Sequence, residues 1–507
     1  MPATSPSYSQ LCALHREVAH LAAISSLVGW DQETYMPPAA AEGRSDQSAM
    51  IASIVHERRT SPRIGELLSA CEGEESLIKP GSETAANLRE MRRDYDLATR
   101  LPGELVAELA KVTSQAQDAW KHARAQNDFA AFAPWLEKVF ALSQRKAECY
   151  GVPAGGELYD ALLDEYEPGA TAAQIAATFT PLRDRLNELL KRITDSGEKI
   201  SEKPLRLKAD AASQHAFGLA VLEAMGFDLS AGRLDTTAHP FCTDIGPGDT
   251  RLTTRYKGEK FTDALYSTLH EMGHGLYEQG LPKHDHFGEP IADDISLGIH
   301  ESQSRMWENF VGRSKAFWKW VIPVAKKHLG KSAGRYGAGD YFAAVNTAKP
   351  SLIRVEADET TYNMHVMIRF ELERALLSGT IKVKDLPGEW NARYMEYLGV
   401  TVPDDRRGCM QDVHWSAGLI GYFPTYTLGN LYAAQFWDKI NDDIPDLSKQ
   451  IGKGRFGELK AWLNEKIHKH GRRYRAAELC KRLTGKELTS DPLLRHLTSK
   501  AQSVYGI

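Results

Sequence analysis

Residues 265–277 read Leu265-Tyr266-Ser267-Thr268-Leu269-His270-Glu271-Met272-Gly273-His274-Gly275-Leu276-Tyr277. Apolar side chains recur every three or four positions here, which predicts an amphipathic helix. Asp263 is suited to cap its start and Gly280 to end it. Residues 270–274 fit the pattern H-E-x-x-H, whose two histidines share one face of a helix because they are four positions apart. The stretch therefore predicts a helix that carries a zinc site.

A catalytic zinc has three protein ligands and one open position. His270 and His274 supply two, and Glu301 is the best candidate for the third. It lies in Gly298-Ile299-His300-Glu301-Ser302-Gln303, on another expected helix. A glutamate at this place indicates a His₂Glu site. Two alternatives remain: ordinary helical histidines, since the chain has 17, and a surface pair of Glu301 with Arg305.

The composition is that of a soluble globular protein. The chain has 507 residues, of which 42% are hydrophobic and 25% charged, and its net charge is −5. Such a balance does not favour nucleic acid or an anionic membrane as a partner. Residues 1–6 lack a basic region and an apolar run, so no signal peptide is expected, and no apolar run approaches 18 residues. The six cysteines form no C-x-x-C pair, so we expect reduced thiols in a cytoplasmic protein.

The order of elements indicates a mainly α-helical chain with one small β element. Helical patterns follow one another from residue 7 to about 228. Leu234–Thr243 and Thr250–Lys257 are rich in Thr and aromatic residues and flank Gly246-Pro247-Gly248. They predict a small antiparallel β element beside the zinc helix, where an extended peptide can pair with a strand.

The helical pattern resumes after residue 291. Long helices are predicted over Asp294–Val321 and Asp340–Leu377. Further on, Thr401–Tyr426 is a long loop rich in Gly, Asp, His and aromatic residues. Loops of this length in compact domains are usually functional.

The motifs as a set resemble those of the carboxypeptidase Taq family of zinc metallocarboxypeptidases. H-E-x-x-H followed by His300-Glu301-Ser302-Gln303 carries the resemblance first. Four more motifs appear in order: Trp30-Asp31-Gln32-Glu33-Thr34-Tyr35-Met36-Pro37, Asp249-Thr250-Arg251-Leu252-Thr253, Ile353-Arg354-Val355-Glu356-Ala357-Asp358 and Gly408-Cys409-Met410-Gln411-Asp412-Val413-His414-Trp415. The resemblance runs from about Tyr8 to the end of the chain.

The resemblance implies a fold and an activity. It implies a large helical domain, with a long substrate groove between two halves and a small antiparallel β element beside the zinc helix. The chain would form a single catalytic domain over residues 1–507, with a helical N-terminal half to about residue 230 and a zinc-site half after it. It also implies one zinc ion per chain, which cobalt can often replace, and a homodimer. The implied activity is release of single C-terminal residues from peptides, with broad specificity.

The residues suggest catalytic roles within that resemblance. Glu271 would act as the general base on a zinc-activated water and return the proton to the leaving amine. His414, Tyr422 and Tyr426 are candidates to stabilise the oxyanion. Tyr422 is the first choice of the two tyrosines, although either can be an ordinary buried aromatic.

Substrate binding needs a group that recognises a free carboxylate. Arg354 is the leading candidate, because a guanidinium pairs with a carboxylate through two hydrogen bonds. Its alternative role is an internal pair with Glu356 or Asp358. His239 can contact the substrate backbone or be structural.

Residues around the ligands suggest supporting roles. Asp249, Asp358 and Asp412 are candidates to orient the ligand imidazoles. Arg251 is expected to brace the sheet against the zinc helix.

Two other functions compete with a carboxypeptidase. A peptidyl-dipeptidase or oligopeptidase would use the same scaffold, and the spacing of the motifs does not exclude it. A zinc scaffold without catalysis is the other, and the intact Glu271 argues against it. In the favoured interpretation the partners are peptides with a free C-terminus and a second copy of the chain, with no nucleic acid and no membrane.

Overall fold

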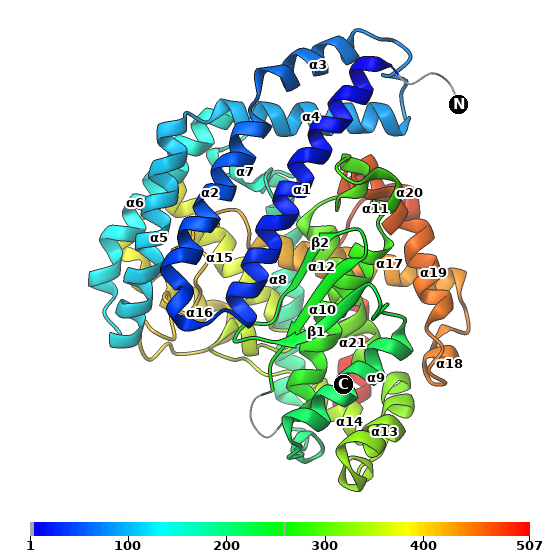
Figure 1. The fold of residues 1–507 in the computed structure, drawn as a ribbon. Coiled ribbons are helices and arrows are strands. Elements are labelled where there is room, and N and C mark those ends of the chain that lie inside the picture. The colour runs from blue at the N-terminus through cyan, green and yellow to red at the C-terminus, as the bar shows by residue number, and fades with distance from the viewer. Residues whose placement is uncertain (1–4, 257–259) are drawn as a thin grey trace. The chain divides into compact units, whose positions relative to one another are not determined.

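The computed structural model of the protein describes residues 5–256 and 260–507 (Figure 1). Residues 1–4, which belong to the segment that predicted no signal peptide, lie outside this part, as does Lys257 at the end of the second predicted strand. Helices make up 69% of the structure and strands 4%. The mainly α-helical fold class with a small sheet is therefore confirmed.

The chain groups into two compact units, each made of three segments. The first contains Met1–Thr99, Ser201–Val345 and Tyr432–Glu487, and the second contains Arg100–Ile200, Asn346–Leu431 and Leu488–Ile507. The single catalytic domain over residues 1–507 stays a prediction.

The elements of the first unit surround the H-E-x-x-H helix. Its α-helices are α1 (Pro6–Thr34), α2 (Ala41–Arg59), α3 (Pro62–Glu72), α4 (Glu83–Arg100), α9 (Ala211–Met225), α10 (Phe261–Gly280), α11 (Lys283–His286), α12 (Leu297–Arg305), α13 (Lys315–Leu329), α14 (Ala338–Val345), α18 (Leu447–Ile451), α19 (Gly457–Lys466) and α20 (Ala476–Thr484). Shorter helical segments are η1 (Pro38–Ala40), η2 (Lys203–Leu205), η3 (Pro290–Ala292), the π-helix η4 (Met306–Gly312), η5 (Lys331–Gly334) and η8 (His468–Arg473).

The second unit is helical throughout the regular structure described for it. Its α-helices are α5 (Gly103–Gln126), α6 (Phe129–Tyr150), α7 (Leu158–Leu163), α8 (Ala172–Asp195), α15 (Tyr362–Leu377), α16 (Leu386–Leu398) and α21 (Asp491–Tyr505). Its short 3-10 helices are η6 (Arg354–Glu356) and η7 (Val383–Asp385), and α17 (Pro424–Asp443) begins in this unit and ends in the first.

Two long predicted helices are interrupted. The stretch 294–321 contains α12, the π-helix η4 and the start of α13, because the hydroxyl of Ser314 accepts a hydrogen bond from the Phe317 amide and opens a new helix. The stretch 340–377 contains α14 and α15, with Pro350 between them. Proline has no N–H to donate and disfavours a helical residue before it.

The small sheet has three strands, β1 (Gly232–Thr236), β2 (Cys242–Gly246) and β3 (Asp249–Thr254), in the order β1-β3-β2. β2 and β3 form the predicted antiparallel pair, and Gly248 takes a φ of +81° in the turn between them, which favours glycine. β1 differs from the prediction, since it pairs with β3 in parallel. The predicted strand Leu234–Thr243 is divided because the chain leaves the sheet after Thr236.

The N-terminal motif holds the end of α1 against this sheet. The Arg251 guanidinium lies 4.2 Å from the centre of the Trp30 ring, and Arg251 also pairs with Asp249. The Tyr35 hydroxyl donates to Asp235 on β1 at 2.5 Å. The prediction that Arg251 braces the sheet against the H-E-x-x-H helix is wrong in its partner, because its side chain contacts Asp249 on β3 and Trp30 on α1.

Among the described residues, α1 is the helix long and apolar enough to cross a membrane by length and composition alone, although the sequence predicted none. Its most apolar 18-residue window has a mean hydropathy of 1.2, and 17% of that window is buried. Helices of soluble proteins meet the same two criteria, and α1 packs on α2 and α3. This finding therefore carries no argument for a membrane.

The helix α10 is held between the sheet and α12 (Figure 1). Leu265, Leu269, Met272 and Leu276 are all buried, as their spacing predicts. The helix starts one turn earlier than expected, with Lys260 and not Asp263 before its first residue, and it ends at Gly280. A Cβ atom on Gly273 would lie 2.5 Å from the Ser304 Cα of α12. A side chain at this position would therefore push the two helices apart.

We expect the substitution Gly273→Ala to lower the thermal unfolding midpoint, because a methyl group in this contact costs about 1–3 kcal/mol of stability. Gly29→Ala is the matched control. Gly29 is an exposed helical glycine, and no atom lies within 4 Å of the place where its Cβ would be, so alanine there should raise stability by about 0.5–1 kcal/mol. Differential scanning fluorimetry of chelator-treated proteins measures both. Equal shifts for the two variants would contradict close packing at Gly273.

Candidate metal centre

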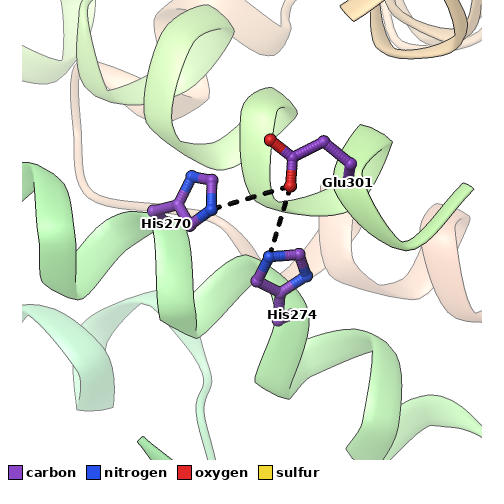
Figure 2. A group of neighbouring side chains, drawn as sticks. All are labelled: His270, His274 and Glu301. Carbon is purple, nitrogen blue, oxygen red and sulfur yellow. Dashed lines mark ion pairs between the residues drawn. The ribbon is translucent and has the colours of Figure 1, made fainter. Parts of the chain in front are cut away.

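His270 and His274 on α10 and Glu301 on α12 come together in the first unit (Figure 2). Glu301 Oε2 lies 3.7 Å from His270 Nε2 and 3.5 Å from His274 Nε2. A tetrahedral ion with ligand bonds of about 2.0–2.2 Å separates its ligand atoms by about 3.3–3.6 Å. The three side chains therefore fit one metal ion, and the structure brings together the three residues that the sequence predicted as ligands.

Local structure points all three side chains at one place. The four-residue spacing on α10 sets the two imidazole rings with centroids 4.9 Å apart. The Ser296 hydroxyl caps α12 by accepting from the Ile299 amide. Arg305 donates to Glu301 Oε1 at 2.6 Å, which leaves Oε2 directed at the histidines. The predicted Glu301–Arg305 pair thus exists, and it does not compete with a ligand role because it uses the other oxygen.

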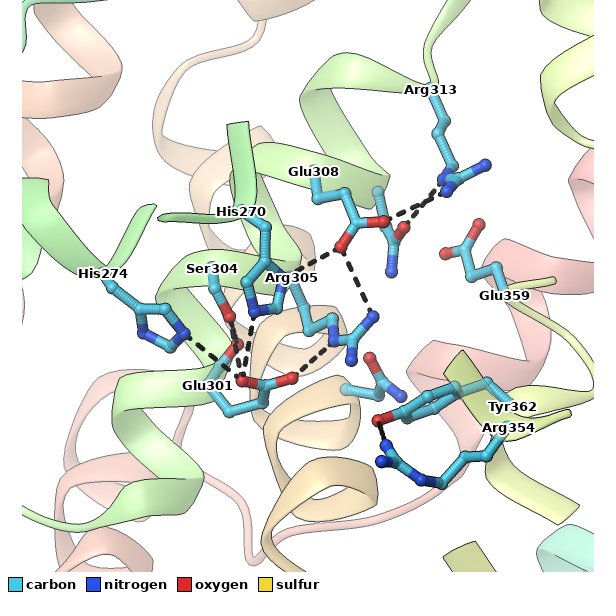
Figure 3. Close-up of polar contacts among 12 residues, drawn as sticks. His270, His274, Glu301, Ser304, Arg305, Glu308, Arg313, Arg354, Glu359 and Tyr362 are labelled. Carbon is cyan, nitrogen blue, oxygen red and sulfur yellow. Dashed lines mark hydrogen bonds and ion pairs between the residues drawn. The ribbon is translucent and has the colours of Figure 1, made fainter. Parts of the chain in front are cut away.

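The ring nitrogen of His270 that faces away from Glu301, Nδ1, contacts a carboxylate. This nitrogen lies 3.0 Å from Glu308 Oε2. Glu308 is itself held by Arg305 at 3.3 Å and by Arg313 at 3.0 Å (Figure 3). Such contacts set the proton position and the orientation of a ligand imidazole.

The outer nitrogen of His274 meets another imidazole. Its Nδ1 lies 2.5 Å from His300 Nδ1, and His300 Nε2 lies 2.7 Å from Glu278 Oε1. Two features of the sequence could have indicated this contact chain. Glu278 lies four positions after His274 on the same helix, and His300 is next to Glu301. Glu308 lies on the π-helix, whose wider turn a 3.6-residue period does not predict.

The prediction that Asp249, Asp358 and Asp412 orient the ligand imidazoles is wrong. Asp249 pairs with Arg251 on β3. Asp358 accepts hydrogen bonds from the backbone amides of Thr360 and Thr361 just before α15. Asp412 is occupied by arginines, as described below, and the imidazole partners are Glu308 and His300.

Glu271 differs from every other carboxylate of the centre. It is 6% exposed, and no hydrogen bond joins its carboxylate to another residue in the described parts of the chain. Burial raises the pKa of Glu271 to about 7, against the opposing effect of His270. A buried carboxyl group with no protein partner and a pKa near neutrality is suited to exchanging protons with water.

Two of the three candidate ligands, His274 and Glu301, are held in the protonation states that bind metal. For His270, burial acts to lower the pKa, but Glu301 and the hydrogen bond with Glu308 raise it overall. Burial lowers the pKa of His274 to about 3, with His300 acting in the same direction. For Glu301, burial acts to raise the pKa, but Arg305 and His270 hold it well below its ordinary value. The result is a neutral imidazole and an ionised carboxylate, as metal coordination requires.

Arg354 in the second unit forms an internal ion pair, but not with the predicted partners. Its Nε and Nη2 donate to Asp412 Oδ1 at 2.9 and 2.8 Å. Its Nη1 donates to the Tyr362 hydroxyl at 3.0 Å, as Figure 3 shows. Arg369 donates to Asp412 Oδ2 at 2.7 Å. Two sequence motifs therefore meet at Asp412. Glu356 and Asp358, the expected alternatives, do not hold the guanidinium.

His414, Tyr422 and Tyr426 gather in the same unit. His414 Nε2 lies 3.2 Å from the Tyr426 hydroxyl. The rings of Tyr422 and Tyr426 meet edge to face, with their centroids 5.3 Å apart. Burial lowers the pKa of His414 to about 4, with Arg354 acting in the same direction. His414 is therefore neutral at physiological pH. His239, the remaining candidate, is exposed in the connection between β1 and β2, and its role stays a prediction.

Comparison with known proteins agrees with these features. The family model described as carboxypeptidase Taq (M32) metallopeptidase matches residues 10–501. Thermostable carboxypeptidase 1 of Thermus thermophilus is 46% identical over 507 residues, which cover 99% of each chain. The crystal structure of the M32 carboxypeptidase from Deinococcus radiodurans R1 superposes with a TM-score of 0.95 at 40% identity, covering 99% of this chain and 100% of that one. A carboxypeptidase structure from Pyrococcus furiosus gives 0.94 at 38% identity, with the same coverage.

A match of this extent decides the family. It also agrees with the H-E-x-x-H helix, the glutamate on α12 and the helical fold. The protein belongs to the carboxypeptidase Taq (M32) family of metallopeptidases and is a peptide hydrolase with carboxypeptidase activity.

Proposed function

We propose that the protein is a zinc-dependent carboxypeptidase that releases single residues from peptide C-termini with broad specificity. His270, His274 and Glu301 hold the ion and Glu271 is the general base. The supporting observation is the spacing of the two Nε2 atoms and one carboxylate oxygen, beside a Glu271 carboxylate that forms no hydrogen bond with the described residues. A donor set of two nitrogens and one oxygen suits Zn²⁺ and also accepts Co²⁺.

Each residue near the reacting groups has a defined task in this proposal. The bound zinc would supply Lewis acidity and activate a water molecule. Glu271 takes the proton of that water and delivers it to the leaving amine, for which a pKa near 7 is suited in both directions. His414 and a tyrosine donate hydrogen bonds to the oxyanion. The contact between His414 and the Tyr426 hydroxyl supports Tyr426 as that partner, ahead of Tyr422, the choice from sequence.

Arg354 is proposed to bind the free carboxylate of the substrate. Its contacts with Asp412 and Tyr362 use three of its five N–H groups. The ion pair with Asp412 fixes the plane of the guanidinium, so little side-chain entropy would be lost on binding. His239 is proposed to contact the substrate backbone.

The proposed partners are peptides with a free C-terminus and a second copy of the chain. The homodimer and a cytoplasmic location follow from the family resemblance and from the reduced cysteines, all six of which are free thiols. Nucleic acid and membranes have no part in the proposal.

Removal of the metal should abolish activity. We expect dialysis against a chelator to reduce hydrolysis of an unblocked peptide to background, and Zn²⁺ or Co²⁺ to restore it, because the three ligands offer no substitute for the ion. Activity is followed by release of free amino acid. Full activity in protein shown by elemental analysis to be metal-free would contradict the proposal.

The substitution Glu271→Gln should separate metal binding from catalysis. Glutamine keeps the size of the side chain but cannot accept the proton, so kcat should fall by about 100- to 10,000-fold while one metal ion per chain remains bound. Steady-state kinetics and elemental analysis measure the two properties. Glu223→Gln on α9 serves as the control for loss of a glutamate charge. A Glu271→Gln protein with wild-type kcat would exclude Glu271 as the base.

A peptide ladder tests the reaction and the role of Arg354 together. Mass spectrometry of a digest should show steps of one residue, and amidation of the C-terminus should block cleavage. Arg354→Lys should lower kcat/KM for the free acid by about 10- to 150-fold, since a hydrogen bond to a charged group contributes about 1.5–3 kcal/mol.

The matched control for Arg354 is Arg374→Lys. It changes another arginine–carboxylate pair of the second unit, with Glu157, and should leave kcat/KM unchanged. Two-residue steps would indicate a peptidyl-dipeptidase. If the amide were cleaved as well as the acid, carboxylate recognition by Arg354 would be refuted.

A further inference from the structure

Glu278 has no task in the proposed reaction, although it lies one helical turn past His274 on α10. It belongs to a buried chain of polar groups. His274 contacts His300, and the two rings have centroids 4.5 Å apart. His300 contacts Glu278 through its other ring nitrogen, and Glu278 pairs with Lys283. The ammonium of Lys283 also lies 2.8 Å from Asp244 Oδ2 on β2.

The two ligand histidines thus have unlike partners. His270 Nδ1 meets the carboxylate of Glu308 directly. His274 Nδ1 meets an imidazole nitrogen, which either donates or accepts, according to the position of its proton. An ionised carboxylate always accepts a hydrogen bond, whereas an imidazole accepts one only when the nitrogen that faces the donor is unprotonated. The orientation of His274 therefore depends on a further group that decides where His300 carries its proton.

Only one arrangement of protons suits metal binding by His274. A nitrogen that binds metal carries no proton, so with Nε2 as the ligand atom the proton of His274 lies on Nδ1. That N–H donates to His300 Nδ1, at 2.5 Å. His300 then carries its own proton on Nε2 and donates it to Glu278 at 2.7 Å. Each donor in the chain faces an acceptor, and the ionised Glu278 is balanced by Lys283.

We propose that His300 is the positioning residue of His274, and that Glu278 and Lys283 hold His300 in the tautomer that accepts from His274. The inference rests on the proposed function, since it assumes that His274 binds the metal through Nε2. Through Asp244 the same chain connects the ligand to β2, at one edge of the sheet. The expected consequence is tighter metal binding, because a ligand held in the correct orientation and tautomer loses less freedom when it binds.

The test measures the zinc dissociation constant of the full chain by competition with a chromophoric chelator. His300→Leu removes the acceptor and should raise the dissociation constant by about 10- to 100-fold. His300→Asn places an amide oxygen near the position of Nδ1 and should restore affinity to within about threefold of wild type. A role in packing alone would not distinguish the polar variant from the apolar one in this way.

His215→Leu is the matched control. His215 lies on α9 in the same unit, and its Nδ1 contacts the Tyr256 hydroxyl at 3.0 Å, so this variant also loses one histidine hydrogen bond. Its zinc dissociation constant should equal that of wild type. Thermal unfolding of the chelator-treated proteins establishes that each variant is folded before its affinity is compared.

Each outcome decides the inference. A folded His300→Leu protein with the wild-type dissociation constant overturns it. If that variant does not fold, Glu278→Ala provides the same test, because it removes the acceptor of His300 Nε2 and leaves Lys283 paired with Asp244. An unchanged zinc dissociation constant in Glu278→Ala also overturns the inference. A wild-type protein that binds no zinc would instead refute the proposed metal centre. The two failures are therefore distinguishable.

Discussion

The close approach of α10 and α12 at Gly273 is the contact on which the metal centre depends. α10 contributes two candidate ligands and the proposed base, and α12 contributes the third candidate ligand. Because a Cβ atom on Gly273 would lie 2.6 Å from the Gln303 carbonyl oxygen, the two backbones touch where the ligands face each other. This proximity lets a short glutamate side chain reach both imidazoles. The glycine inside the H-E-x-x-H pattern is thus part of the geometry of the site.

Charge compensation shapes the rest of the site. Burying an ionised carboxylate is costly unless a cation and hydrogen bonds accompany it. Glu301 has Arg305, Glu308 has Arg305 and Arg313, and Glu278 has Lys283. Asp412 in the second unit has Arg354 and Arg369. Glu271 has no such cation at hydrogen-bonding distance among the described residues, and its pKa rises accordingly. Within the metal centre, Glu271 is therefore the carboxylate that the described residues leave without a cation partner.

Most of the helical fold could be predicted from sequence, because apolar periodicity records which face of a helix is buried. The errors have local causes. A 3.6-residue period does not reveal a π-helix, so the pattern predicts one continuous helix across Met306–Gly312. The parallel direction of β1 depends on the path of the segment between Thr236 and Cys242. This segment has no apolar periodicity that would predict its path. Residue type alone favours Asp249, Asp358 and Asp412 as imidazole partners, whereas the observed partners, Glu308 and His300, depend on which helices pack together.

The linear sequence was enough to predict the helical class, the three candidate ligands and the proposed base. These depend on spacing along one helix or on residue chemistry, and both can be read from a linear chain. The packing of the helices was needed to show that Glu308 contacts His270 Nδ1, that His300 contacts His274 Nδ1, and that Asp412 pairs with Arg354. Those contacts join residues from separate elements, and their distances depend on how the backbones pack. No local pattern contains that information, because side chains far apart in sequence meet only after the helices have docked.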